Sequence, residues 1–344
     1  MKEKKNNFTF ICLTYNHECY ILEHLESIKY LVENFGDEFA IDLIIADDAS
    51  SDRTTEYCKS WLFRNDHLFN KVMILSDGIN RGTCKNLTRA IQHLSTEYCK
   101  ITAGDDVYSF ENIFVELVKI NGNHILSGFP LRLLDGDISI DRFDLFNLVA
   151  TNVIYRKASY LTRLKRINFF NSPNIVYAKS ALLNSEVVDF VDQFSVTEDY
   201  PLQIKMAELF HPLRYVQIRK ILVYYRRTSG STYLTKNTAF NRDKLAIFTY
   251  LLLSESTFFG KLLLQNRKYC FRIKRPYLKR VLNLNLYLYG SAVILHILKI
   301  MAEVRNIKPQ LDQHQKHYEM IAVMAKKYDS QFSAVKANSS QPKF

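Results

Sequence analysis

The chain has 344 residues, of which 47% are hydrophobic and 24% charged, and it contains only 10 glycines and 7 prolines. This composition excludes a disordered chain and a collagen-like repeat. The charge is uneven: residues 1–210 hold 22 basic and 29 acidic side chains, whereas residues 211–344 hold 24 and 6. We therefore expect different partners for the two parts, with the first suited to metal or sugar chemistry and the second to phosphates or an anionic surface.

The six cysteines are scattered, with no CxxC pair and no histidine-rich companion at the spacing of a zinc site: Cys12, Cys19, Cys58, Cys84, Cys99 and Cys270. Such scatter indicates buried thiols in a reducing compartment. The lysine-rich residues 1–7 lead directly into an apolar run, without the hydrophobic region and cleavage site of a signal peptide. The sequence therefore predicts a protein of the cytoplasm.

The first hundred residues alternate between short apolar runs and segments with helical spacing. Apolar runs occupy residues 8–13, 41–46, 72–75 and 98–102, and helical spacing follows at 20–32, 54–63 and 83–94. This alternation is typical of an α/β domain with a parallel sheet. Ligands of such sheets bind beyond the carboxyl ends of the strands. The residues expected there are polar: 14–17, 47–52, 80–82 and 105–106.

Beyond residue 124 the pattern is less regular. We expect a strand at 151–155, a helix at 197–209 whose first turn holds two acids and a proline, and a further strand at 216–225. From about residue 240 the pattern is helical and basic. The last residues, 331–344, are polar and are expected to be disordered.

Acidic residues follow two of the predicted strands. Asp47 and Asp48 come after one apolar run, and Asp105 and Asp106 come after another. One such loop is often only the N-cap of the next helix, but two at the same sheet edge favour a site for a hard divalent cation. Mg²⁺ and Mn²⁺ are usually held by one or two carboxylates together with diphosphate oxygens. The glycine-rich phosphate loops GxxxxGK[ST] and GxGxxG do not occur in the sequence.

Six short motifs occur in the order in which the family-two glycosyltransferases carry them: TYNHECYI at 14–21, DDASSDRT at 47–54, NRGTCKN at 80–86, AGDD at 103–106, TEDYPL at 197–202 and YRRTSGS at 225–231. The chain thus resembles this family over about residues 8–235, and it looks most like the bacterial enzymes that build surface polysaccharides. The resemblance implies a GT-A fold, which is a Rossmann-like, mostly parallel sheet flanked by helices. It also implies a nucleotide-sugar donor, a divalent metal and an inverting single displacement.

The resemblance places the donor nucleotide at the strand ends. Thr14 and Tyr15 would flank the base, with Tyr15 stacking on it, and Asp47 or Asp48 would hydrogen-bond the base edge and the ribose. Other residues that the resemblance implies for donor binding are Asn16, Arg81, Lys85, Asn86, Arg226 and Ser231. The last two belong to a segment that closes over the diphosphate.

The resemblance also assigns the metal and the base. Asp105 matches the metal-binding aspartate of the family's DxD motif, with Asp106 helping, although Ala103 replaces the first acid. Glu198 and Asp199 match the ED motif, whose aspartate is the catalytic base. An acceptor hydroxyl needs such a carboxylate to remove its proton, and we expect Glu198 to raise the pKa of Asp199. The alternative is that both acids only complement a helix dipole.

Residues 267–280 carry seven basic side chains and no acid, and the following residues 281–301 are largely apolar. The apolar part has the length of a membrane-spanning helix, but its polar interruptions argue against a span. Two interpretations stay open: residues 267–301 bind an anionic membrane surface, or they form helices packed on the catalytic domain with a basic face in water. Nucleic acid is not expected, because no recognised binding motif accompanies the basic residues.

The sequence thus predicts a GT-A catalytic domain at 1–235, a basic helical region at 236–330 and a disordered tail at 331–344. We expect a cytoplasmic glycosyltransferase, peripheral on the inner face of the cell membrane. It would move a sugar from a nucleotide-sugar donor, a UDP-sugar, to a growing or lipid-linked surface glycan such as an O-antigen, lipooligosaccharide or capsule unit. Ala103 favours one alternative, a non-catalytic glycan- or membrane-binding protein. A second alternative is a sugar-phosphate nucleotidylyltransferase, against which the missing N-terminal glycine-rich loop argues.

Overall fold

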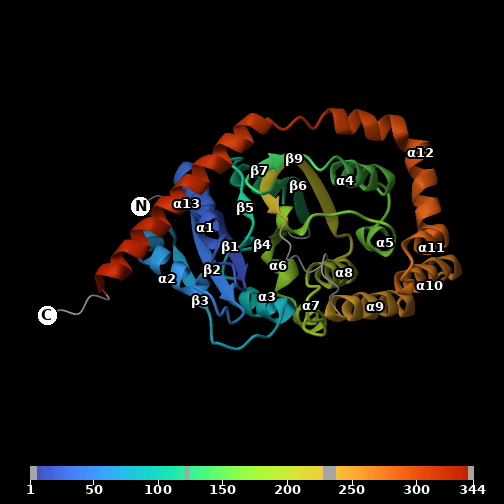
Figure 1. Ribbon diagram of the computed structural model, residues 1–344. Helices are drawn as coiled ribbons and strands as arrows, with labels where there is room; N and C mark the ends of the chain where they lie inside the picture. The colour runs from blue at the N-terminus through green and yellow to red at the C-terminus, as the bar shows by residue number, and fades with distance from the viewer. Residues whose placement is uncertain (1–5, 121–123, 228–237, 340–344) are drawn as a thin grey trace.

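The computed structural model describes residues 6–120, 124–227 and 238–339 (Figure 1). Its centre is a mixed sheet with the strand order β3-β2-β1-β4-β8-β6-β9-β5, and β7 pairs with β6 beside this path. The first four strands of the chain run parallel: β1 (Asn6–Thr14), β2 (Phe39–Asp47), β3 (Lys71–Leu75) and β4 (Tyr98–Ala103). The predicted α/β fold is confirmed, and the strands extend the apolar runs by one to three residues.

The second part of the sheet changes direction. Strand β8 (Ile175–Ala178) runs antiparallel to β4 and to β6 (His124–Leu134), whereas β9 (Arg214–Arg226) runs parallel to β6. The short strands β5 (Val107–Tyr108) and β7 (Asp137–Ser139) pair antiparallel with β9 and β6. As a result, the end of β9 lies beside the loop that follows β4.

Side chains of β1 alternate between two hydrophobic cores, one on each face of the sheet. Phe8 and Phe10 belong to the first core, and Ile11 and Leu13 belong to the second. Helices α1 (Ile21–Phe35) and α2 (Thr54–Asn65) contribute to the first core, and α3 (Thr83–Gln92), α7 (Ser185–Val191) and α8 (Asp199–Leu209) contribute to the second. Burial on both faces explains why the parallel strands read as continuous apolar runs.

The strand predicted at residues 151–155 is wrong, because α4 (Arg142–Ile154) contains nearly all of this segment. The Asp141 side chain caps the start of the helix, where it accepts hydrogen bonds from the backbone N–H groups of Phe143 and Asp144 at 3.1 Å each. Leu148 and Val149 then pack in a third core. Capping and packing outweigh the strand preference of the β-branched residues near the helix end.

The remaining elements are short: helices α5 (Tyr160–Lys165) and α6 (Lys179–Leu182), and 3-10 helices at Asp66–Leu68, Phe114–Lys119 and Ser172–Asn174. They connect strands and complete the walls of the cores. The tight turn at Ser172–Asn174 leads into β8, and the preceding residues 169–171 reach the end of the sheet where the polar loops gather.

The C-terminal helices follow the outer edge of the molecule, and the last one returns across α1 and α2 (Figure 1). They are α9 (Thr238–Leu253), α10 (Phe258–Arg272), α11 (Pro276–Val281), α12 (Leu284–Arg305) and α13 (Leu311–Ser339). The disorder expected from residue 331 is not found up to Ser339. Phe332 is buried against the Tyr57 ring, with 5.1 Å between ring centroids, so α13 is held by packing there. Residues 340–344 lie outside the described residues.

Candidate active site

A cavity of about 970 Å³ lies at the carboxyl ends of β1, β2 and β4. The starts of α3 and α8, residues 169–173 and the end of β9 complete its wall. Ten residues predicted from the sequence lie in this wall: Thr14, Tyr15, Asn16, Asp48, Asn86, Asp105, Asp106, Glu198, Asp199 and Arg226. Asp47, Arg81 and Lys85 do not line it, and Ser231 lies outside the described residues.

Asp47 and Asp48 have different surroundings. Asp47 is buried behind the cavity wall, where its carboxylate accepts hydrogen bonds from the hydroxyls of Thr14 at 3.0 Å and Ser50 at 2.5 Å. Asp48 reaches the cavity, and its oxygens accept the backbone N–H groups of Arg81 and of the following glycine at 2.6 and 2.9 Å. Of these two aspartates, Asp48 is the one that lies in the cavity wall, and Asp47 stabilises the turn behind it.

The loop after β1 forms the rim of the cavity. The Tyr15 side chain is 49% exposed, which leaves its ring accessible to a ligand. Asn16 adopts a left-handed backbone with φ of 54°, and its side-chain oxygen accepts the backbone N–H of Ser51 at 2.8 Å. The β1 and β2 loops therefore support each other, which presents Tyr15 at a defined place.

Residues 81–86 bring backbone and amide groups, rather than cations, to the cavity wall. The Arg81 guanidinium lies 2.6 Å from Asp77, and this contact lowers the pKa of Asp77 to about 2. Lys85 is exposed outside the cavity. Asn86 lines the cavity and donates its side-chain N–H to the Ala46 carbonyl at 2.7 Å.

Gly82 lets residues 81–86 pack closely against the backbone that precedes α8. Its φ is +83°, and a Cβ at this position would lie 2.7 Å from the Ser195 carbonyl oxygen. A side chain would therefore meet both an unfavourable backbone conformation and a steric clash. This close approach keeps residues 195–197 beside the β2 and α3 loops.

Asp105 and Asp106 follow β4 in the cavity wall. Asp106 is buried: one carboxylate oxygen accepts the Arg226 backbone N–H at 3.0 Å, and the other has no partner among the described residues. Burial, and then the charge of Asp105, raise the pKa of Asp106. Gly104 permits this tight loop, because a Cβ there would lie 2.9 Å from the methyl group of Thr14.

Arg226, at the end of β9, is held from two sides. Its Nε donates to the Asp105 carbonyl oxygen at 2.6 Å, and its guanidinium forms an ion pair with Glu23 of α1. Tyr318 of α13 donates to the same Glu23 carboxylate at 3.3 Å. Neither Glu23 nor Tyr318 belongs to a motif, and neither was predicted from the sequence. The contacts keep one positive charge beside the acidic loop.

Glu198 and Asp199 stand at the N-terminus of α8, and both line the cavity. Burial, followed by the charge of Asp199, raises the pKa of Glu198 to about 8. Glu198 is therefore mostly protonated at neutral pH. Glu198 was expected to raise the pKa of Asp199, whereas in the structure it is the pKa of Glu198 itself that is raised.

The segment before these acids is tied to α9 by one buried carboxylate. A single oxygen of Asp243 accepts the backbone N–H groups of Ser195 at 2.9 Å, Val196 at 2.8 Å and Thr197 at 3.3 Å. Asp243 was not predicted as a site residue, because it lies more than forty residues beyond the motif that it supports. The arrangement gives the start of α8 a fixed position on the cavity wall.

The family model described as glycosyl transferase family 2 matches residues 9–182, just over half of the chain. The chain belongs to this family. Uncharacterized proteins of Mycobacterium tuberculosis and Mycobacterium bovis are 27% identical to this glycosyltransferase, over 43% of its length and 46% of theirs. The family match gives no support to the nucleotidylyltransferase alternative.

Solved glycosyltransferases share the fold. TarS of S. aureus, residues 1–349 in complex with UDP-GlcNAc, is 16% identical with a TM-score of 0.54, over 91% of this chain and 90% of that one. The mannosyltransferase PcManGT of Pyrobaculum calidifontis, in complex with GDP-Man and Mn²⁺, is 14% identical with a TM-score of 0.50, over 93% and 86%. The chain spans about half the length of the mycobacterial relatives and 55% of a longer TarS chain. At such identities the likeness establishes the fold alone.

The acidic loop of this glycosyltransferase fits a divalent cation that is shared with a ligand. In the part of the chain that the structure describes, no three His, Cys, Asp or Glu side chains form a metal site on their own. Asp105 in the cavity wall and the unpartnered oxygen of Asp106 supply two carboxylates. A cation that also binds diphosphate oxygens needs only one or two, so this donor set is sufficient.

Proposed function

We propose that this glycosyltransferase moves a sugar from a UDP-sugar to a hydroxyl of a growing or lipid-linked bacterial surface glycan, with inversion at the anomeric carbon. One observation carries the proposal: a single cavity contains the β1 loop, the acidic loop after β4, Arg226 and the two acids of α8. Sugar transfer needs these groups, because it requires a nucleotide contact, positive charge for the leaving diphosphate and a base for the acceptor.

The donor nucleotide would lie against the β1 and β2 loops. Tyr15 offers an accessible aromatic face, while Thr14, Asn16 and Asp48 offer polar atoms in the same part of the wall. TarS was solved with UDP-GlcNAc and PcManGT with GDP-Man, so this fold accepts either nucleotide in other proteins. A uridine donor for this chain is our proposal.

The diphosphate would lie between the acidic loop and Arg226. Asp105, with Asp106, would hold a Mn²⁺ or Mg²⁺ ion, which when bound supplies positive charge to the diphosphate. The Mn²⁺ in PcManGT supports this assignment. Arg226 adds a second cation whose position is set by Glu23, and it stabilises the negative charge that develops as the sugar leaves.

The acceptor proton would go to Asp199. Glu198 is mostly protonated at neutral pH, so its carboxyl group does not compete for this proton. A base positioned at the acceptor hydroxyl raises its nucleophilicity as the new glycosidic bond forms. Because a single displacement attacks opposite to the leaving diphosphate, the product should carry the inverted anomeric configuration. We place this reaction at the cytoplasmic face of the cell membrane, where a lipid-linked acceptor is available.

A thermal-shift screen of nucleotide sugars with and without Mn²⁺ tests the proposal. A ligand at one hundred times its Kd stabilises a protein by about 2.7 kcal/mol, so a UDP-sugar should raise Tm in the presence of Mn²⁺. Asp105→Asn should abolish this Mn²⁺-dependent shift, and Asp135→Asn, an exposed change outside the cavity, should not.

Donor hydrolysis separates an enzyme from a binding protein. We expect slow, Mn²⁺-dependent release of UDP from the parent protein. A Tm shift without any donor turnover would favour the non-catalytic alternative that Ala103 suggests. An unchanged Mn²⁺-dependent shift in Asp105→Asn would contradict the metal assignment.

A further inference from the structure

Helix α12 has one packed stripe and one exposed apolar stripe. On the packed side, Tyr289 donates to the Asn147 side chain of α4 at 2.7 Å, Asn285 donates to the Leu263 carbonyl of α10 at 3.0 Å, and Ile300 is fully buried. The opposite side repeats large apolar residues at helical spacing, interrupted only by a serine: Leu284, Tyr287, Leu288, Ile294, Leu295 and Leu298. Leu295 and Leu298 are 81% and 86% exposed.

This helix lies along the protein rather than apart from it. By length and composition Leu284–Arg305 is apolar enough to cross a membrane, with a mean hydropathy of 1.4, and only 11% of its apolar window is buried. However, its packed stripe contacts α4 and α10 over several turns. The exposed stripe, from Leu284 to Leu298, is therefore an apolar strip of about 21 Å on the surface of a folded domain.

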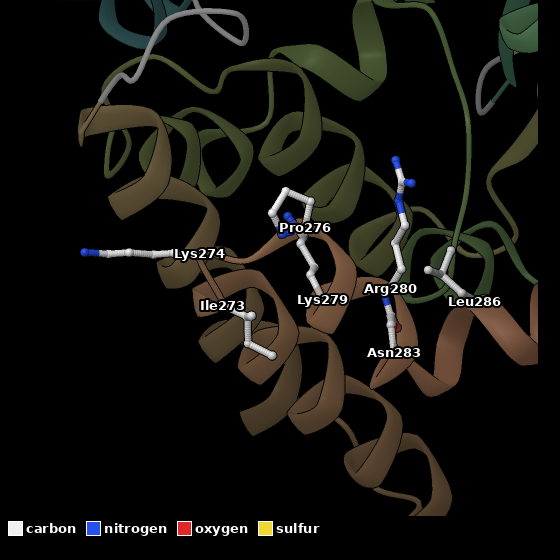
Figure 2. A pocket seen from close by; sticks show the side chains of 7 residues that line it. All are labelled: Ile273, Lys274, Pro276, Lys279, Arg280, Asn283 and Leu286. Carbon is white, nitrogen blue, oxygen red and sulfur yellow. The ribbon is translucent and has the colours of Figure 1, made fainter.

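Positive charge surrounds the start of this strip. Residues 256–302 contain nine lysines and arginines and no acid. A pocket of about 460 Å³ between α11 and α12 is lined by three of these cations together with apolar and amide side chains: Ile273, Lys274, Pro276, Lys279, Arg280, Asn283 and Leu286. In Figure 2 the cations spread around the pocket, with Lys274 pointing out to the left and Arg280 upward. Such a pocket suits an anionic phosphate group attached to an apolar body.

Charge decides between the partners that this face could contact. A symmetric dimer through α12 would bring two acid-free segments together, each with nine cations, and like charges repel. An anionic bilayer offers the opposite charge and a hydrocarbon layer for the apolar strip. Tyr277 and Tyr287, both more than half exposed, are amphipathic side chains of the kind enriched at membrane interfaces.

We propose that α11 and α12 form a membrane-docking face that binds the surface of an anionic lipid bilayer. The apolar strip enters the acyl boundary, and the pocket cations contact lipid phosphates. The packed side of α12 also lies next to the candidate active-site cavity, because Phe169 lines that cavity and its ring lies 6.2 Å from the Tyr289 ring. Membrane docking does not depend on the proposed function. Only the idea that docking brings the cavity to a lipid-linked acceptor rests on that function.

Co-sedimentation of the full chain with vesicles tests the docking face. The parent should bind phosphatidylcholine vesicles that contain phosphatidylglycerol at least tenfold more tightly than vesicles of phosphatidylcholine alone. Arg272→Gln/Lys274→Gln/Arg280→Gln should lose at least tenfold of this binding, and so should Ile294→Gln/Leu295→Gln/Leu298→Gln. Lys326→Gln/Lys327→Gln removes two exposed charges from α13 and is the matched control that should bind as the parent does.

A nucleotide-sugar thermal shift on the same variants shows that they remain folded, and transfer to a soluble acceptor should be unchanged. Three outcomes overturn the proposal: equal vesicle binding by the variants, resistance of the parent to carbonate extraction, which indicates a spanning helix, or a lipid-free dimer that the α12 variant abolishes. Because vesicle binding needs no turnover, a failed sugar-transfer assay with intact lipid binding would count against the proposed function alone.

Discussion

The two carboxyl groups at the start of α8 are neighbours in the sequence, yet they are suited to different tasks. Burial and the charge of Asp199 raise the pKa of Glu198 to about 8. A protonated Glu198 adds no second negative charge to the site at neutral pH, and its carboxyl group is available as a hydrogen-bond donor. This difference is consistent with the proposal that Asp199, rather than Glu198, accepts the proton.

Replacing each carboxyl group by its amide tests the separate roles of Asp199 and Glu198. Asp199→Asn should lower kcat by ~10²–10⁴, the usual contribution of a general base, while the donor Kd stays nearly unchanged, because the amide keeps the shape of the side chain. Glu198→Gln is the matched variant and should retain most activity at pH 7, since glutamine resembles the protonated acid. Steady-state kinetics and calorimetric donor titration measure the two quantities. A fully active Asp199→Asn enzyme, or a product with the donor's anomeric configuration, would disprove the assignment.

At the scale of elements, α9 positions α8. Asp243 accepts three consecutive backbone N–H groups immediately before Glu198, and Gly82 lies so close to the same segment that a Cβ there would be 2.7 Å from the Ser195 carbonyl oxygen. Residues 195–197 therefore have little freedom to move. The C-terminal helices thus support the segment that leads to the proposed base, Asp199.

Asp243→Asn tests this support. One hydrogen bond to a charged group contributes about 1.5–3 kcal/mol, so the variant should lose stability of this order in urea unfolding. It should also lower kcat more than it raises the donor KM, because α8 carries the proposed base. Asp189→Asn, on the exposed side of α7, changes the same chemistry without touching the segment. Equal loss in both variants, or a change confined to KM, would contradict the positioning role.

The elements differ in how well the sequence predicts them. Parallel strands are predicted to within a few residues, because burial on both faces requires a continuous apolar run. The wrong strand at 151–155 shows the limit of this argument. Thr151, Val153 and Ile154 favour a strand locally, but the Asp141 cap and the packing of Leu148 decide for a helix, and packing is not visible in a local pattern.

The same distinction applies to the candidate site. Motifs gave the residues that touch the cavity, such as Asp48, Asp105 and Asp199, because each follows a strand or starts a helix. Glu23 and Tyr318 could not be found in this way. Their role depends on contacts across 203 and 295 residues of sequence, which only the folded chain brings together.

At the scale of the whole molecule, α13 is held on the sheet domain by a buried pair of histidines. His314 and His317 lie 3.0 and 3.2 Å from the Tyr224 hydroxyl, and Glu111 lies 3.7 Å from His314. The Tyr30 ring packs on His317 at 4.6 Å between centroids. Burial lowers the pKa of each histidine to about 4, and His314 adds to the effect on His317.

The free energy of unfolding should therefore decrease as the pH falls. Both histidines have a folded pKa below the usual value near 6.5, so the unfolded chain binds their protons first. Their contribution to stability is complete above about pH 6.5 and is lost as the pH falls toward 4. Urea unfolding at pH 7 and pH 5 should show the loss, and hydrogen exchange should locate the earliest opening in α13.

Variants separate this effect from other acid-sensitive groups. Burial raises the pKa of Glu111. Protonation of Glu111 therefore increases the free energy of unfolding as the pH falls, which opposes the effect of the histidines. His314→Gln/His317→Gln should reduce the pH dependence between 6.5 and 4. His67→Gln/His93→Gln, at two exposed positions, should leave it intact. If the unfolding free energy of His314→Gln/His317→Gln still depended on pH as that of the parent does, α13 would not be held by neutral histidines.

The return of α13 has a consequence for synthesis of the protein on the ribosome. Tyr328 and Phe332 complete the core that begins at Phe8, and Tyr57 donates to Asp329 at 2.5 Å. At 5–20 residues per second, about 15–60 s separate the emergence of Phe8 from that of Tyr328. During that time the apolar surface of α1 and α2 that α13 later covers stays exposed to water. We therefore expect this apolar surface to need protection by chaperones while the chain is being translated.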